Sequence, residues 1–530
     1  MKNSILFVAF ILSGYLFSQN NIDVKHYSLH LNLDPRQKTV VLEELIEIQL
    51  LNDALQIELD LIGLDKDGSG MEVTSVTILK KAIKWRQLPD RLVLDIPKKY
   101  SNQTISLLIK MHGQPQDGLV ISKNRYGAPT IFADNWPNRA RYWYACHDHP
   151  SDKATYTFDV YAPQSYAVVA NGTLVFDTPQ KEKNGLTWWC YMIDEPIATK
   201  VAVIGVADFN SKEIGKVDGI PIFATVYPQD SLGGMASFEV APQILNFYQK
   251  TIAPYPFLQL NNVQSTTRYG GMENVGCIFY DEESLTQNRR STLLIAHEIA
   301  HQWFGNTVTE SDWQHLWLSE GFATYLTNYY IEMTEGQAPF REQLVQDRNR
   351  VINFSKKFQA ALVDSLTTDL NDRLNPNAYQ KGSWVLHMLR VELGDSTFWS
   401  GIQSFYESYK YKNASSEDFC KSMLSGVKDA NTIARLETFF YEWLYQVGHP
   451  QLKATLETKN GQQYLNLTQI QKPLFTFPLK VAFYDENNNA VLLRYQITAK
   501  ENSFALPQTL NHKKLRFELD PFTELLFELK

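Results

Sequence analysis

Two histidines and a glutamate within one short segment have the spacing of a metal site. The segment reads His297-Glu298-Ile299-Ala300-His301. Side chains at positions i and i+4 of a helix lie on the same face, so both imidazoles can bind one ion. Glu298 follows the first histidine and can reach a water molecule on the ion without binding the ion itself. Because this pattern also arises by chance, the prediction of a metal site depends on a third ligand.

Glu320 is the candidate for that third ligand. A catalytic zinc ion is held by three protein ligands and keeps a fourth position open. Glu320 lies at the start of a second predicted helix, and the loop before this helix is long enough for it to fold back against the first. On its own, Glu320 would be interpreted as a solvated carboxylate that the helix dipole favours. Beside His297 and His301 we interpret it as a ligand, and we expect one Zn²⁺ per chain.

Four motifs in a fixed order resemble the gluzincin zinc metallopeptidase family of aminopeptidase N and leukotriene hydrolase. The resemblance covers the whole chain in outline and implies a zinc aminopeptidase that hydrolyses unblocked amino-terminal residues from peptides. The motifs are Tyr269-Gly270-Gly271-Met272-Glu273-Asn274, His297-Glu298-x-x-His301-x-Trp303-Phe304-Gly305-Asn306, Trp317-Leu318-x-Glu320-Gly321-Phe322-Ala323 and Tyr379-Gln380-Lys381-Gly382.

The chemistry of peptide hydrolysis gives roles to two of these side chains. Zinc polarises the scissile carbonyl and lowers the pKa of its water, and Glu298 takes the water proton as general base and later passes it to the leaving amine. Attack creates an oxyanion that needs a donor besides zinc. The resemblance assigns that donor to the hydroxyl of Tyr379, which would otherwise be one packing tyrosine among 27.

Glu273 separates an aminopeptidase from an endopeptidase. A carboxylate facing the free α-ammonium pairs with it by a charge-assisted bond and rejects peptides whose amino terminus is blocked or distant. The Gly270-Gly271 pair permits close approach of the backbone to the peptide, which the resemblance suggests binds along this segment as an added strand.

The sequence departs from the family pattern at two positions near the site. Ser319 stands where the family usually has asparagine before the third ligand, which changes the surroundings of the ligand without removing it. The family often has glutamine or glutamate about ten residues before a Pro-Cys-type segment, where it helps to hold the α-amine. Counting back from Cys146 leads to Trp136, and Asp134 or Asn135 are the alternatives that the sequence leaves open.

Two other functions use the same residues. One is epoxide hydrolysis of the leukotriene hydrolase type, whose additional pocket residues we do not find in the sequence. The other is a non-catalytic peptide-binding scaffold, although the presence of both histidines, Glu320, Glu298 and Tyr379 gives that alternative no support. No segment matches the long helical domain of larger relatives, so we expect a more open site that accepts longer peptides.

The elements that must position these residues form a multidomain α+β chain. Polar and apolar residues alternate up to about residue 209, as in an antiparallel β domain, and helical periodicity follows in 238–252, 291–304, 320–333 and 382–393. Alternation returns after His449-Pro450. We expect an N-terminal antiparallel β domain at 19–208, a thermolysin-like, mainly helical catalytic domain at 209–447, as the resemblance implies, and a C-terminal β-sandwich at 448–530.

Composition and the first residues restrict the partners and the compartment. The chain has 530 residues, is 44% hydrophobic and carries a formal net charge of -8, which argues against extensive disorder and against nucleic-acid binding. Lys2 and the apolar run Ile5 to Phe17 predict a signal peptide at 1–18. We therefore expect an exported protein, periplasmic or extracellular and bacterial, with no stable membrane anchor. Four scattered cysteines allow several disulfide pairings.

Overall fold

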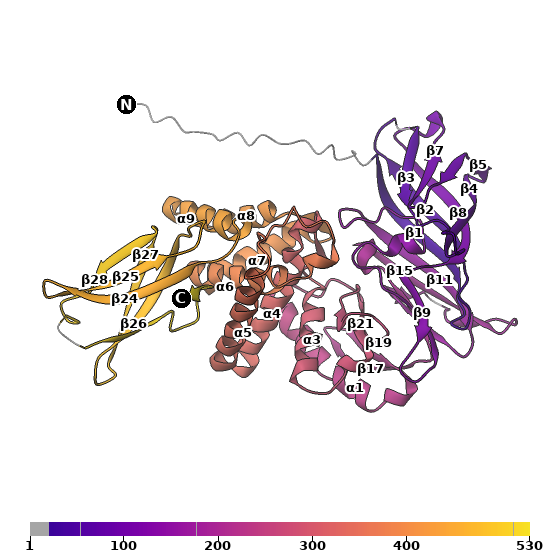
Figure 1. Ribbon diagram of the computed structural model, residues 1–530. Helices are drawn as coiled ribbons and strands as arrows, with labels where there is room; N and C mark the ends of the chain where they lie inside the picture. The colour runs from indigo at the N-terminus through magenta and orange to yellow at the C-terminus, as the bar shows by residue number, and fades with distance from the viewer. Residues whose placement is uncertain (1–20, 54, 176, 512–513) are drawn as a thin grey trace.

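The computed structural model describes residues 21–53, 55–175, 177–511 and 514–530. Three units follow one another along an elongated molecule, with the N-terminal strands at one end, the helices in the middle and the C-terminal strands at the other end (Figure 1). The predicted signal peptide lies outside the described residues. Within the described part of the chain, no helix combines the length and the apolar character that crossing a bilayer requires.

The N-terminal domain is built on a large sheet of nine strands among the described residues. Its central strand β1 pairs antiparallel with β2 and parallel with β11. Residues of β1 alternate between the core and the other face, as the sequence pattern predicts, because successive side chains of a strand point to opposite faces. The main strands are β1 (Ile22–Asn32), β2 (Val40–Leu50), β8 (Thr104–Gln114), β11 (Lys153–Pro163) and β15 (Leu186–Ala198).

A second sheet of this domain lies next to the catalytic domain. Its order is β12-β16-β10-β9, and its strand β10 (Pro129–Ala133) leads directly into the loop that contains Trp136. The last strand of the sheet, β16 (Ile204–Ala207), is followed by β17 (Asn210–Val217), the first strand of the next domain. The other strands are β9 (Leu119–Lys123) and β12 (Ala167–Ala170).

The catalytic domain contains a five-stranded sheet that the periodicity does not predict. Its order is β17-β18-β19-β21-β20. Strand β19 (Leu260–Ser265) is rich in polar residues and yet fully buried, because Asn262 accepts a hydrogen bond from Tyr280 and Gln264 accepts one from the backbone of Tyr227. The remaining strands are β18 (Ile220–Val226), β20 (Gly271–Met272) and β21 (Cys277–Asp281).

Helices pack beside this sheet and carry the metal-site motifs. Helix α3 (Arg289–Ala300) begins after Asn288, whose side chain accepts a hydrogen bond from the Ser291 amide. Helix α4 (Trp317–Glu335) is buried along most of its length and packs on α6 (Gly382–Leu393). The two helices approach closely at Gly321 and Gly382, since a Cβ on Gly321 would lie 2.9 Å from the Cα of Gly382.

The C-terminal domain contains two sheets, of four and three strands among the described residues. It contacts helix α5 (Gln337–Ser355) through Arg348, which donates to Asp520 and to the backbone carbonyl of Leu525. The four cysteines of the chain are free, and no disulfide links them. The principal strands are β24 (Gln451–Lys459), β25 (Gln462–Gln469), β26 (Phe477–Tyr484) and β27 (Ala490–Ile497).

Candidate metal centre

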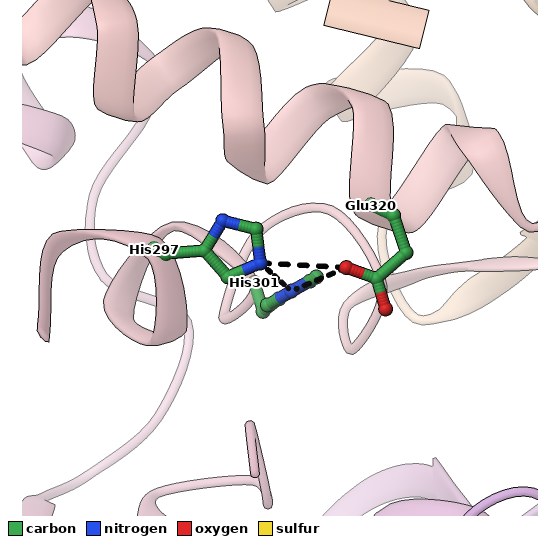
Figure 2. A group of neighbouring side chains, drawn as sticks. All are labelled: His297, His301 and Glu320. Atoms are coloured by element: carbon green, nitrogen blue, oxygen red, sulfur yellow. Dashed lines mark hydrogen bonds and ion pairs between the residues drawn. The ribbon is translucent and has the colours of Figure 1, made fainter. Parts of the chain in front are cut away.

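Helices α3 and α4 bring His297, His301 and Glu320 together (Figure 2). The two Nε2 atoms are 3.1 Å apart, and each lies 3.3 Å from Oε2 of Glu320. Two donors of a tetrahedral zinc site with bonds of about 2.0 Å are about 3.3 Å apart. The triangle therefore has the size and the donor types, two imidazoles and a carboxylate, that suit zinc.

Contacts behind the triangle fix the ring of His301. Its Nδ1 lies 3.1 Å from the carbonyl oxygen of Phe304 and 3.1 Å from the hydroxyl of Ser319. Gly305, at φ +115°, passes close to Ser319 and to the ring of His301, and a Cβ there would lie 2.3 Å from Oγ of Ser319 and 2.9 Å from Nδ1 of His301. Ser319, the departure from the family pattern, thus contacts the ring of a candidate metal ligand and helps to orient it.

Burial and neighbouring charges shift the pKa values of the ionisable groups of the site. Burial lowers the pKa of His297, which favours the neutral imidazole that binds a metal. Burial opposes ionisation of Glu320, but the two histidines lower its pKa below the usual range. Burial, reinforced by the carboxylates of Glu320 and Glu273, raises the pKa of Tyr379 well above its usual value, so the phenol keeps its proton at neutral pH.

Glu298 lies between the metal triangle and strand β20. Its side chain is buried, and burial raises its pKa well above the usual range. A Cβ on Gly271 would lie 2.4 Å from Oε1 of Glu298, so the backbone of β20 packs directly on this carboxyl group. Gly270 differs, because a Cβ there would meet Ser284 Oγ at an ordinary 3.5 Å. Of the two glycines in the motif, Gly271 is the one in contact with the site.

Glu273 is a buried carboxylate with one oxygen, Oε1, that has no hydrogen-bond partner among the described residues. Its backbone carbonyl accepts hydrogen bonds from Gln302 at 2.9 Å and from Asn306 at 2.6 Å, which tie β20 to the end of α3. Glu273 also lies within 4.8 Å, oxygen to ligand atom, of Glu298 and His301. A buried oxygen without a partner is costly, so it is suited to a cationic ligand.

Tyr379 stands on a single π-helical turn, η8 (Asn377–Lys381), just before α6. Its ring stacks beside His297, with centroids 5.9 Å apart and planes 15° apart. Lys381, from the same motif, is buried and donates from Nζ to the carbonyl oxygen of Gly448 at 3.0 Å. Tyr379 is therefore held over the metal triangle, while Lys381 is a structural anchor.

The cavity at this centre contains all of the predicted site residues except Gly270. Four more side chains complete its walls, of which Tyr269 and Met272 adjoin a recognised motif. Trp136 is the position that the count from Cys146 indicates, and no sequence signal indicates Leu374. The lining residues are Trp136, Tyr269, Gly271, Met272, Glu273, His297, Glu298, His301, Glu320, Leu374 and Tyr379.

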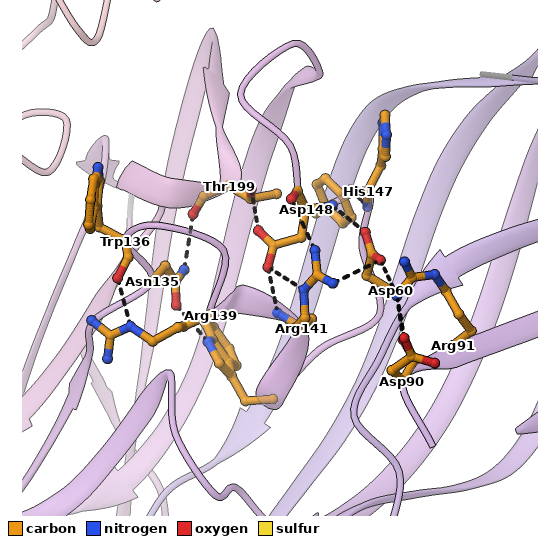
Figure 3. A network of polar contacts seen from close by, with 12 residues as sticks. Asp60, Asp90, Arg91, Asn135, Trp136, Arg139, Arg141, His147, Asp148 and Thr199 are labelled. Carbon is orange, nitrogen blue, oxygen red and sulfur yellow. Dashed lines mark hydrogen bonds and ion pairs between the residues drawn. The ribbon is translucent and has the colours of Figure 1, made fainter. Parts of the chain in front are cut away.

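Asp134 and Asn135, the polar neighbours of Trp136 in the sequence, make contacts away from the cavity, and Figure 3 shows that of Asn135 with Thr199. Asp134 is paired with Arg139 at 2.5 Å, and the amide of Asn135 donates to the carbonyl oxygens of Thr199 and Ala202. Neither of these two side chains lines the cavity. The structure therefore places the indole of Trp136, rather than the side chain of Asp134 or Asn135, in the lining of the cavity that also contains Glu273.

Comparisons with known proteins agree with this geometry. The family profile "Peptidase family M1 domain" matches residues 236–443, and "Peptidase M1 N-terminal domain" matches residues 23–199. The chain belongs to peptidase family M1. This membership confirms the resemblance that the four motifs indicate, and zinc is the ion that we assign to the triangle.

Relatives within the family are distant in sequence. The chain is 27% identical over 350 residues to aminopeptidase M1-A of Oryza sativa subsp. japonica, covering 63% of this chain and 38% of the relative. It is 24% identical over 452 residues to leucyl aminopeptidase of Saccharolobus solfataricus, covering 81% of this chain and 55% of the relative. The chain thus spans about half, or less, of the length of these relatives.

A solved structure confirms the fold class. The M1 zinc metallopeptidase from Deinococcus radiodurans superimposes with a TM-score of 0.68 at 22% identity. The match covers 81% of this chain and 95% of that chain. It includes the expected sequence of a β-rich domain, a helical catalytic domain and C-terminal sheets.

Proposed function

We propose that the protein is a zinc aminopeptidase that hydrolyses unblocked amino-terminal residues from peptides. The observation that carries the proposal is the unpartnered, buried oxygen of Glu273 beside the His297, His301 and Glu320 triangle. Metal ligands with Glu298 alone support a metallohydrolase. Glu273, a carboxylate beside the triangle that needs a cationic partner, supports a metallohydrolase that selects substrates with a free amino terminus.

Zinc, Glu298 and Tyr379 each have a separate role in the proposed reaction. Bound zinc supplies a Lewis acid for the scissile carbonyl and lowers the pKa of the attacking water. Glu298 accepts the proton of that water and passes it to the leaving nitrogen. Tyr379 keeps its proton because burial raises its pKa, and it donates a hydrogen bond to the oxyanion.

Glu273 restricts the proposed reaction to the amino-terminal residue of the peptide. Its free oxygen pairs with the α-ammonium of the substrate, and an acetylated or internal amide offers no charge to compensate the buried carboxylate. Gly271 lets strand β20, along which we expect the peptide to bind, lie close to Glu298, since a side chain at that position would overlap the carboxyl group. The peptide is thereby placed with its first amide bond over the metal triangle.

A panel of amino-acyl aryl amides and their acetylated counterparts tests this function. We expect cleavage of the free amines only, loss of cleavage with a zinc chelator, and recovery when zinc is restored. Glu298→Gln should retain zinc and lose turnover. Chelator-insensitive cleavage would overturn the zinc mechanism, and equal cleavage of acetylated substrates would overturn the role of Glu273.

Epoxide hydrolysis and a non-catalytic scaffold are the alternatives, and no contact among the described residues favours either. We also propose, from the leader at residues 1–18, that the protein is exported. Expression of the full chain in a bacterium, followed by fractionation and amino-terminal sequencing, tests this. A mature protein that begins near residue 19 outside the cytoplasm is expected, and an intact cytoplasmic chain would contradict it.

A further inference from the structure

Among the described residues of the N-terminal domain, Trp136 alone lines the metal-site cavity. Its side chain is 2% exposed. The ring stands edge-to-face against Tyr269, with centroids 5.9 Å apart, and against Trp313 at 5.8 Å. An indole therefore closes the cavity on the side that faces the N-terminal domain.

Contacts with Arg139 and Trp313 support Trp136. Arg139 donates from Nε to the carbonyl oxygen of Trp136 at 2.6 Å (Figure 3). Trp313, which supports the other side of the ring, lies 5.7 Å from Nζ of Lys200, and Lys200 is paired with Glu310 in a fully buried ion pair. Arg139 thus fixes the backbone of Trp136, and the indole is packed against two rings, one of which faces a buried ion pair.

The space in front of the wall is small. The cavity has a volume of about 50 Å³. Since one water molecule needs about 10–15 Å³ on this measure, the whole cavity has room for about three to five water molecules. Met272 and Leu374 close other parts of the boundary with apolar groups.

The charged side chains near Trp136 are paired with side chains of opposite charge. Arg139 is paired with Asp134 and Asp117, and Arg268 lies 2.8 Å from Asp117. Two guanidinium groups thus face two carboxylates, so these four side chains offer no net charge that would select an acidic or a basic side chain.

We propose that Trp136 determines the substrate class of this site, restricting it to peptides whose first residue is small and uncharged, alanine or glycine. This inference rests on the proposed aminopeptidase function. The small cavity excludes larger side chains by overlap with the indole, and the paired charges give no compensation for charged ones. Trp136 acts as a specificity-determining residue, while Glu273 alone holds the α-ammonium.

The test compares the zinc-loaded full chain on alanine, leucine, phenylalanine, glutamate and lysine p-nitroanilides. We expect kcat/KM for alanine to exceed that for leucine by at least about tenfold, the discrimination available from a few methylene groups. Trp136→Ala should raise the leucine-to-alanine ratio by about tenfold or more. Trp85→Ala, which removes a half-buried indole remote from the cavity, should leave the ratio unchanged.

The outcomes separate the two proposals. Chelator-sensitive cleavage with leucine or phenylalanine preferred, or an unchanged ratio in Trp136→Ala, would overturn the role of Trp136 and leave the aminopeptidase intact. Absence of cleavage of every anilide would overturn the proposed function itself. If Trp136→Ala does not fold, as judged by zinc content and circular dichroism, Trp136→Leu takes its place and should shift the ratio in the same direction.

Discussion

Gly271 packs against Glu298 so closely that a single methyl group at position 271 would lie 2.4 Å from Oε1 and 2.6 Å from Cδ of the carboxyl group. The contact joins strand β20, along which we expect the substrate to bind, to the candidate general base. Any side chain at 271 must therefore move Glu298, and the position of the proton acceptor depends on a residue that has no chemistry of its own.

Gly271→Ala is expected to lower kcat by about a hundredfold, because displacement of the general base by about 1 Å costs about that much. Zinc content should stay at one ion per chain. Gly270→Ala is the matched control, since a Cβ there meets only ordinary contacts. Steady-state kinetics of both variants on one aminoacyl anilide checks the prediction, and equal activities would contradict it.

Glu273→Gln is expected to lower kcat/KM for free-amine substrates by about a hundredfold or more, since an amide in place of a buried carboxylate leaves the α-ammonium without a counter-charge. Its effect on acetylated substrates should be small, so the discrimination between the two classes falls. The exposed Glu283→Gln is the control. A variant that loses activity equally on both classes would place Glu273 in another role.

Ser319→Ala is expected to weaken zinc binding about 10–100-fold, because it removes the hydroxyl that lies 3.1 Å from Nδ1 of His301. Competition with a chromophoric chelator measures the zinc Kd directly, without reference to turnover. Ser503→Ala, on the C-terminal domain, serves as the control. A zinc Kd identical to that of the wild type would show that the Phe304 carbonyl alone orients the ring.

Lys381 gives a pH dependence of stability. Burial lowers its pKa from 10.5 to about 8. In the window between these values the unfolded chain binds more protons than the folded one, so stability contributed by this group rises with pH. Relative to Lys381→Met, the wild type should gain about 2 kcal/mol between pH 8 and 9.5.

Urea unfolding of the two proteins at both pH values measures that gain. The exposed Lys472→Met should show no such pH-dependent difference from the wild type. A wild-type minus Lys381→Met difference that is constant with pH would mean that Lys381 remains charged in the folded protein.

Sequence periodicity predicts the elements that are buried by apolar side chains. Helix α6 begins and ends where the pattern predicts, at Gly382 and Leu393, because its first turns bury a continuous set of side chains. Strand β19 escapes prediction for the opposite reason. Its asparagine and glutamine side chains are buried by hydrogen bonding, and such bonds leave no hydrophobic period in the sequence.

Some residues of the candidate site can likewise be predicted from the sequence, and others cannot. Spacing within one helix is enough to bring His297 and His301 together, and a motif on the next helix adds Glu320. The walls of the cavity come from loops far apart in the chain. Trp136 comes from the N-terminal domain and Leu374 from the next one, so they line one cavity only when both domains are folded. A count along the sequence points to position 136, but no pattern indicates Leu374. The difference between Gly270 and Gly271 likewise depends on which of them faces Glu298.

The hydrogen bond from Lys381 to Gly448 carries a consequence for the architecture. Lys381 lies two positions after Tyr379, and Gly448 immediately precedes the C-terminal sheets. The C-terminal domain therefore helps to fix the π-helical turn that carries Tyr379, although none of its described residues lines the cavity. Removing that domain is expected to expose the Lys381 ammonium and loosen the turn that carries Tyr379, the candidate oxyanion donor, without removing any of the candidate metal ligands.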